Sequence, residues 1–321
     1  MARLTGGKLG KLLMPDEAEE PILGRPVRAA LLEWLTEIWA EDELTAVGLA
    51  ARRRAIFHGA PGTGKTTLAH HLAARLGLPL AIIRPDDVVG RFMGTGITNV
   101  ANIFNAIEQQ EEPLVVFFDE FETIAQKRMT TGVNEAVEHD HNAMINALLA
   151  RLDAYSGFII AATNHAKLID PAIWRRFEIQ IELAVPGQGE RERILARYLA
   201  PFALPKRELA GLAEALETAA PSLMRQLAEG LKRQIVVGPK ADWPMDRDSV
   251  FARVIAASEP HPDLGKPRLW SLGAEDKAVK AITWPLRRAA DLPAEIDLPP
   301  TPVDPSGVIP FRKARLTESA G

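Results

Sequence analysis

Short apolar segments alternate with helical patterns from residue 21 to about residue 185. Strands that alternate with helices favour a parallel sheet covered on both faces. The segment Leu114–Phe118 is apolar throughout, which is typical of a central strand buried on both sides. The predicted strands are Ala55–His58, Leu80–Ile83, Leu114–Phe118, Phe158–Ala162 and Glu178–Leu183, and the helical patterns between them include Thr66–Leu76, Val100–Gln110 and Glu138–Leu152.

The pattern changes after Pro186 and Gly187. Residues 190–237 carry only helical patterns, and Asp246–Ala257 adds one more, which predicts a small all-helical domain. We therefore divide the chain into four parts. They are a flexible N-terminal arm at 1–20, an α/β domain at 21–186, a helical domain at 187–258 and a Pro-rich C-terminal extension at 259–321.

The C-terminal extension contains Trp270 and Trp284, and one short helix is predicted at Ala274–Ile282. Its many prolines exclude long helices. Two interpretations stay open. The extension docks on a partner or a neighbouring subunit, or it lies as a strap across the helical domain of its own chain.

Composition narrows the function classes. The formal net charge of −4 over 321 residues disfavours a protein that coats nucleic acid through bulk charge. The absence of cysteine excludes disulfides, thiolate zinc sites and thiol catalysis, and it fits a reducing cytoplasm. No apolar stretch of the length that a membrane span needs is present. We therefore expect a cytoplasmic protein with neither a nucleic-acid nor a membrane partner.

A phosphate-binding loop follows the first predicted strand. The run from Gly59 to Thr66 has the P-loop pattern G-x-x-x-x-G-K-T, and a helix is predicted after it. Glycines let successive backbone N–H groups face phosphate oxygens, and the helix N-terminus adds a positive dipole. Lys65 is expected at the β- and γ-phosphates and Thr66 at Mg²⁺. The predicted nucleotide-binding residues here are Pro61, Gly62, Thr63, Gly64, Lys65, Thr66 and Thr67.

Polar residues follow two further strands. Asp119 and Glu120 come directly after Leu114–Phe118, at the sheet edge where parallel sheets hold their ligands. Asp119 is expected to hold Mg²⁺ through water, and Glu120 to act as the general base. The next strand ends at Asn164, which is expected to orient the attacking water beside the γ-phosphate. ATP and Mg²⁺ are therefore the predicted cofactors.

The order of these motifs, followed by the segment from Asp170 to Glu178, resembles the AAA+ ATPases, and most of all the AAA branch that remodels proteins. The resemblance covers about residues 21–258. It implies a P-loop NTPase fold with a five-stranded parallel sheet of order 5-1-4-3-2, and it identifies the helical domain as a lid. It also implies a homo-oligomeric ring, usually a hexamer, with ATP bound between subunits.

In this family, the segment that matches Asp170–Phe177 carries arginines that reach the phosphate bound by the adjacent subunit. A guanidinium there stabilises the charge on the transferring phosphoryl group. Arg175 and Arg176 match these positions. They are adjacent, as in the microtubule-severing and ESCRT-disassembling subgroup, whereas many relatives separate them. We favour Arg176 as the finger and Arg175 as its support, although the pattern leaves the choice open.

Two further nucleotide contacts follow from the resemblance. Leu23 and Gly24 are similar to the stretch that contacts adenine before the first helix. Arg225 lies where many AAA+ proteins have a second phosphate sensor. The protein-remodelling branch usually lacks that arginine, which puts the role of Arg225 in doubt.

The segment with Phe92, Met93 and Gly94 resembles the family's first pore loop. An aromatic ring and a thioether can grip an extended peptide with little dependence on its sequence. Residues 127–140 match a second pore loop, and solvent or pore contact is favoured over a metal site for His139 and His141.

The leading hypothesis is a ring-forming ATPase that remodels, unfolds or translocates a protein substrate, with a separate enzyme or adaptor as a possible partner. A DNA-handling factor of the clamp-loader or helicase-loader kind is an alternative, but Phe92 and Met93 argue against it because DNA translocases favour Lys or Arg in the pore. A nucleotide-gated scaffold is a third hypothesis. Glu120, Asn164 and Arg176 argue against it, since a scaffold needs no hydrolytic set.

Overall fold

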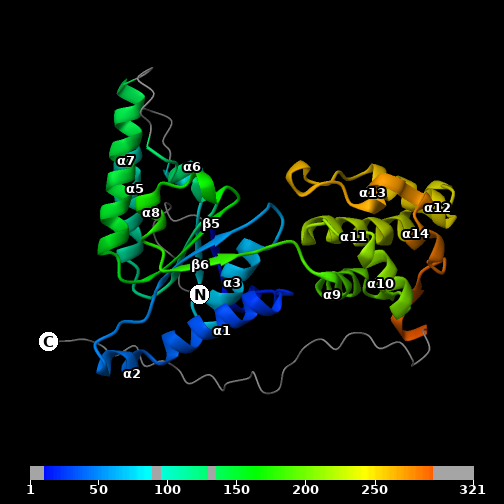
Figure 1. Ribbon diagram of the computed structural model, residues 1–321, viewed down its shortest axis with the longest axis horizontal. Coiled ribbons are helices and arrows are strands. Elements are labelled where there is room, and N and C mark those ends of the chain that lie inside the picture. The colour runs from blue at the N-terminus through cyan, green and yellow to red at the C-terminus, as the bar shows by residue number, and fades with distance from the viewer. Residues whose placement is uncertain (1–10, 89–94, 129–134, 292–321) are drawn as a thin grey trace. The chain divides into compact units, whose positions relative to one another are not determined.

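The computed structural model describes residues 11–88, 95–128 and 135–291, and they divide into two compact units (Figure 1). Residues 11–30 and 52–185 form the α/β unit, and residues 31–51 and 186–291 form the helical unit. The predicted α/β domain, 21–186, therefore differs by the segment 31–51. That segment contributes helices but no strand to the sheet.

The α/β unit contains a six-stranded sheet of order β1-β3-β4-β5-β2-β6. The pairs β3–β4, β4–β5, β5–β2 and β2–β6 are all parallel. If the five predicted strands are numbered along the chain, these read 2-3-4-1-5, which is the expected order taken from the other edge. The strands are β1 Lys11–Leu13, β2 Arg54–His58, β3 Leu80–Ile83, β4 Val115–Phe118, β5 Phe158–Thr163 and β6 Ile179–Glu182.

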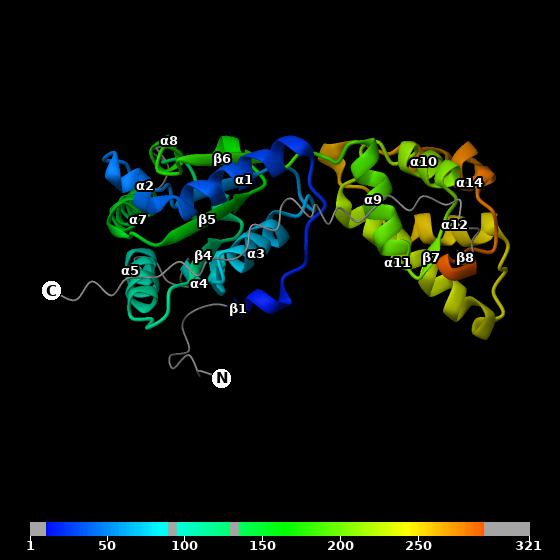
Figure 2. The ribbon, with the colours of Figure 1, turned by 90° about the horizontal axis from the view of Figure 1, so that it is seen from below.

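The core of this unit lies between the sheet and two long helices. Alternate residues such as Ile56, Val116 and Ile159 point to the same apolar cluster as Phe104 and Leu148. These last two come from α5 and α7, which pack side by side in both views (Figures 1 and 2). The helices of the first part of the chain are α1 Arg25–Trp39, α2 Glu41–Ala46, α3 Lys65–Arg75, α4 Pro85–Val88, α5 Thr95–Glu108, α6 Phe121–Ile124, α7 Glu135–Ala154 and α8 Pro171–Trp174.

The predicted flexible arm at 1–20 is wrong for residues 11–20. Lys11–Leu13 pair antiparallel with β3, so that Lys11 lies opposite Ile82, and the sheet is mixed rather than wholly parallel. The turn after β1 packs on α3, where Met14 O lies 2.8 Å from His70 Nε2 (Figure 2). An edge strand leaves backbone groups unpaired, and a nearby segment can satisfy them. A three-residue strand is too short for apolar alternation to reveal it.

The helical unit is built on α9 to α12, with two short helices added by the C-terminal region. Its elements after residue 186 are α9 Gln188–Leu199, β7 Phe202–Ala203, α10 Lys206–Glu214, α11 Pro221–Val237, α12 Arg247–Ala256, α13 Arg268–Leu272, α14 Lys277–Ala281 and β8 Arg287–Arg288. The antiparallel ribbon of β7 and β8 was not predicted. Within the part of the chain that the structure describes, no helix combines the length and apolar character needed to cross a membrane.

Residues 259–291 are part of the helical unit rather than a separate extension. The Trp270 indole N–H donates to Ser258 O at 2.7 Å, and the Trp284 indole N–H donates to Met245 O at 2.7 Å. The Trp284 ring also meets Phe251 edge to face. Of the two interpretations left open for this region, the described part is therefore the strap across its own unit.

A buried ion pair anchors this strap. Asp276 is fully buried; one carboxylate oxygen lies 3.1 Å from Arg268 Nε, and the other accepts the Ala278 N–H at the start of α14. Removing one partner of a buried pair leaves an uncompensated charge, which typically costs 3–5 kcal/mol.

We predict that Asp276→Ala lowers the free energy of unfolding by about 3–5 kcal/mol, because Arg268 loses its buried partner and is left with the exposed Glu214, and α14 loses its cap. The measurement is urea unfolding followed by circular dichroism. Asp263→Ala is the matched control: its side chain is 64% exposed, and we expect a change within about 0.5 kcal/mol. Equal midpoints for the two variants would contradict the anchoring role.

Candidate functional site

The phosphate-binding loop joins the end of β2 to the start of α3. Gly59 has φ +142°, and a side chain on this residue would collide with the backbone carbonyl of Leu183. Gly64 has φ +99° and immediately precedes α3. Both positions require glycine for conformation, and Gly59 requires it for space as well. The loop therefore has the backbone geometry that its sequence pattern predicts.

Lys65 lies on the loop that it is expected to serve. Its ammonium donates to Gly59 O at 2.8 Å and to Ala60 O at 2.9 Å. Burial lowers the pKa of Lys65 to about 8, although the carboxylates of Glu122 and Asp119 oppose this shift. An anionic phosphate beside the amine would favour its charged form again. Because of its position and its lowered pKa, the protonation of Lys65 is sensitive to a nearby anion.

The side-chain oxygens of Thr66 and Asp119, the two predicted Mg²⁺ ligands, lie close together although they come from different elements. The Thr66 hydroxyl on α3 donates to the Asp119 carboxylate at the end of β4, at 3.4 Å. Glu120 follows in the left-handed region, at φ 47° and ψ 44°, and its side chain is exposed. A non-glycine residue in this region is uncommon, and such residues cluster at functional sites. The turn directs Glu120 away from the buried strand.

Glu122 joins this group, although the sequence analysis did not select it. Its Oε1 accepts the backbone N–H of Asn164 at 3.2 Å, and its buried Oε2 has no hydrogen-bond partner among the described residues. Asn164 lies just beyond the end of β5, as predicted. Glu122 therefore connects the acidic turn after β4 to the loop after β5. The available signal was a third acidic residue two positions after Glu120.

Asp170 positions the helix that precedes the two arginines. It is 5% exposed, and its carboxylate accepts the Ala172 N–H at 2.8 Å to cap α8. Arg128 Nε lies 3.6 Å from the other carboxylate oxygen. The Asp-Pro pair that opens a helix was a usable sequence signal for this role.

The two arginines have different environments. Arg176 forms two hydrogen bonds of 3.0 Å with the Asp153 carboxylate of α7, and it donates a third to Ala172 O. This pairing lowers the pKa of Asp153. Arg175 is exposed, and no partner is recorded for its side chain within the described part of the chain. Arg176 thus binds α7 of its own chain, whereas Arg175 is exposed.

Comparison with known proteins identifies the family of the domain that contains this site. Residues 55–185 match the model of the "ATPase family associated with various cellular activities (AAA)". The matched segment contains the loop, the acidic turn, Asn164 and both arginines. The chain carries an AAA ATPase domain. Such domains bind and hydrolyse ATP, and the predicted AAA resemblance is confirmed.

Individual relatives agree with this assignment. An uncharacterized AAA family ATPase of Sinorhizobium fredii is 39% identical over 151 residues, which are 46% of this chain and 44% of the relative. An ATP-dependent zinc metalloprotease FtsH of Acidothermus cellulolyticus is 31% identical over 175 residues, or 53% of this chain and 26% of the relative. This chain therefore spans less than half the length of these relatives.

Among solved structures, the FIGL-1 AAA domain superposes with a TM-score of 0.60 at 19% identity. The match covers 79% of this chain and 87% of that domain. At this identity the likeness concerns the fold alone. It supports the assignment of an AAA fold to the region around the site.

The donor set of the AAA domain fits ATP with Mg²⁺. Thr66 and Asp119 supply hard oxygen ligands, which Mg²⁺ prefers, and Mg²⁺ usually takes only one or two protein ligands beside phosphate oxygens and water. No group of three or more His, Cys, Asp or Glu that could hold a metal is present in the described ranges. When bound, the cation would neutralise charge on the phosphates, and these two residues would hold it.

The remaining predicted site residues are Leu23, Gly24, Arg225, Phe92 and Met93. Leu23 and Gly24 are partly buried before α1, where Gly24 O accepts the Arg28 N–H. Arg225 lies in the helical unit, where it pairs with Glu229 at 2.7 Å and covers the Tyr198 ring. Phe92 and Met93 lie outside the described residues, as does the middle of the second predicted pore loop. These roles stay predictions.

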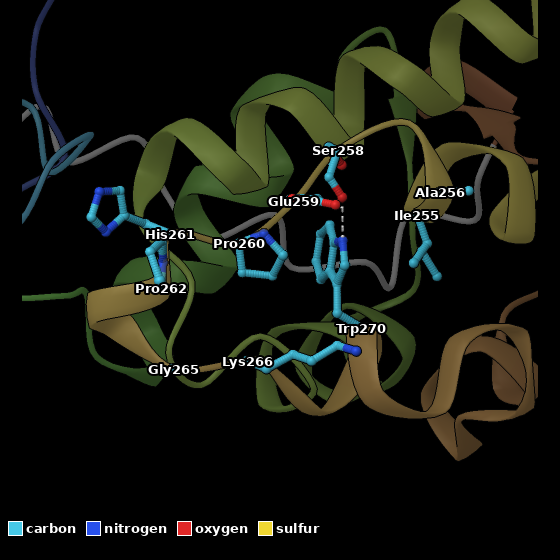
Figure 3. Close-up of a pocket in the computed structure, with 10 residues that line it drawn as sticks. All are labelled: Ile255, Ala256, Ser258, Glu259, Pro260, His261, Pro262, Gly265, Lys266 and Trp270. Atoms are coloured by element: carbon cyan, nitrogen blue, oxygen red, sulfur yellow. Dashed lines mark hydrogen bonds between the residues drawn. The ribbon is translucent and has the colours of Figure 1, made fainter.

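A separate cavity of about 480 Å³ lies in the helical unit beside Trp270 (Figure 3). Figure 3 shows Pro260 next to the indole, whose N–H is directed to Ser258. The cavity is lined by Ile255 to Trp270, and none of the predicted nucleotide-binding residues contributes to it.

We predict that nucleotide affinity depends on pH through Lys65. Its pKa of about 8 means that the folded loop loses a proton above that pH, whereas bound phosphate retains it. The affinity for ADP should therefore be level below about pH 8 and fall by up to about tenfold per pH unit above it. Titration of a fluorescent ADP analogue from about pH 7 to about pH 9.5 measures this.

Lys65→Arg is the matched control for this titration, because arginine stays charged throughout the range. That variant should bind more weakly but without the alkaline decline. The same decline in both proteins would show that another group is responsible.

Proposed function

We propose that this chain is a subunit of a ring-forming oligomer, a hexamer as in the family it resembles, that hydrolyses ATP with Mg²⁺ to remodel a protein substrate. The observation that carries the hydrolytic part is the contact of Thr66 with Asp119 beside Glu120 in a left-handed turn. In this scheme Lys65 binds the phosphates, Glu120 takes the proton of the attacking water, and Asn164 orients that water.

The need for a second subunit rests on the arginines. A cation that stabilises the transferring phosphoryl group is worth about 10³–10⁵ in rate in related systems. Arg175 is exposed at the end of α8, and no partner is recorded for its side chain in the described ranges. We therefore assign the contact with the neighbour's phosphate to Arg175. Arg176, which the sequence analysis favoured, instead supports α8 through Asp153.

A protein substrate is supported by the similarity to FtsH, which is named as an ATP-dependent metalloprotease. The predicted pore residues Phe92 and Met93 give the same indication. DNA handling remains the alternative, and the test below distinguishes the two. A cytoplasmic location and a separate adaptor or partner enzyme stay predictions.

We predict that Glu120→Gln lowers kcat for ATP hydrolysis by about 10²–10⁴-fold while the affinity for ATP is unchanged, because only the proton acceptor is lost. Steady-state phosphate release and equilibrium ATP binding measure the two quantities. Glu112→Gln, the same change on an exposed loop, is the control and should match the wild type. Normal turnover by Glu120→Gln would refute the general base.

The same Glu120→Gln protein, held in its ATP-bound form, also tests the substrate class. With a labelled unfolded polypeptide and a labelled DNA duplex as probes, we expect retention of the polypeptide. Retention of the duplex alone would favour the DNA-handling alternative.

We predict that Arg175 acts on a neighbouring subunit. Arg175→Ala subunits hold ATP but supply no arginine, whereas Lys65→Ala subunits supply the arginine but do not hold ATP. Each preparation alone should be nearly inactive, and mixing them should restore turnover at interfaces where the two defects complement each other. Arg176→Ala mixed with Lys65→Ala serves as the comparison. Recovery only in the Arg176 mixture would assign the finger to Arg176 instead.

A further inference from the structure

The phosphate loop and the arginine segment are joined by two aromatic rings within the α/β unit. His58 is the last residue of β2 and directly precedes Gly59 of the loop. Trp174 is the last residue of α8 and directly precedes Arg175. The two ring centroids lie 5.6 Å apart with an interplanar angle of 57°. This distance is within the range of a stabilising aromatic contact.

The backbone that carries His58 is held on both sides. His58 pairs with Thr163 of β5 and Glu182 of β6, and its carbonyl accepts the Leu183 N–H at 2.7 Å. A side chain on the next residue, Gly59, would collide with the Leu183 carbonyl. The His58 ring is therefore attached to a fixed point at the base of the phosphate loop.

The backbone that carries Trp174 is held as well. The Trp174 N–H donates to Asp170 O at 2.9 Å within α8, whose first turn is capped by the buried Asp170 carboxylate. Trp174 is partly buried and packs against the main core cluster. A side chain fixed in this way limits where the following residue, Arg175, can lie.

The charge state of His58 suits this contact. Burial lowers the pKa of His58, the positive charge of Lys65 lowers it further, and the carboxylate of Glu182 opposes both. The ring is therefore uncharged at neutral pH and can pack against an indole without desolvating a charge. His58 also comes directly before Gly59 and Ala60 in the chain. The carbonyls of these two residues accept hydrogen bonds from the Lys65 ammonium.

We propose that the contact of His58 with Trp174 positions Arg175, and so links the phosphate loop of a subunit to the arginine that the same subunit presents to its neighbour. The pair acts through Arg175 and does not touch the phosphates. This inference rests on the proposed trans role of Arg175.

The test uses complementing subunits. Arg175→Ala subunits serve as acceptors, with an intact site but no arginine, and Lys65→Ala subunits serve as donors, with an intact arginine but no site. Trp174→Leu is then added to the donor or to the acceptor. We expect turnover to fall by about 10- to 100-fold when the donor carries it, since small misplacements of a catalytic group have costs of this order. The same change in the acceptor should have little effect.

Two further variants separate positioning from folding. Trp174→Phe retains a ring beside His58 and should restore most donor activity, whereas Trp174→Leu should not, with both variants assayed at a temperature where thermal unfolding shows them folded. His58→Leu in the donor should reproduce the loss, and combining it with Trp174→Leu should add little, as expected of residues that act together.

The outcomes are distinct. Full complementation by the Trp174→Leu donor, or an equal loss when the acceptor carries the change, would overturn the inference while leaving the proposed function intact. Absence of complementation in the parental pair would instead refute the trans role of Arg175, and the inference with it.

Discussion

The position of β2 within the sheet is the constraint on which the site depends. This first strand of the ATPase core lies between β5 and β6, which come much later in the chain. The carboxyl end of β2 therefore lies between the loop that follows β5 and the loop that follows β6. Gly59 fits there only because it has no side chain to meet the Leu183 carbonyl.

This constraint explains which elements contribute the groups that we propose around the phosphates. Groups that bind and activate are contributed by loops at the same sheet edge, where Lys65, the Thr66–Asp119 contact and Glu120 come together. Glu122 holds the backbone of Asn164, so that the acidic turn and the loop after β5 are one unit. The arginines follow a different element, α8, which Asp170 fixes by its cap. In the proposed mechanism, the AAA domain therefore contributes one part of its own hydrolytic site and an arginine that completes the site of a neighbour.

Sequence reasoning succeeded where a residue's role depends on local chemistry, and it was incomplete where the role depends on a distant partner. The glycines of the loop and the acidic pair after a buried strand could be recognised because backbone freedom and strand ends are local properties. Glu122 was missed, since its function is a hydrogen bond to Asn164, 42 residues away. The hydrogen bonds between Arg176 and Asp153 of α7 could not be seen in the sequence, because the two residues are 23 positions apart.

The sequence by itself determined the parallel strands, their order through the family resemblance, the phosphate loop and the residues that surround it. The strands follow from apolar periodicity, their order is implied by the resemblance, and the phosphate loop follows from a motif whose spacing is dictated by phosphate geometry. Only the tertiary structure decided that Lys11–Leu13 extend the sheet, that Trp270 and Trp284 pack on their own unit, and that Arg176 binds Asp153 whereas Arg175 is exposed. The reason is physical: these outcomes depend on which unpaired backbone group, cavity or carboxylate lies nearby in space, and separation along the chain does not encode that.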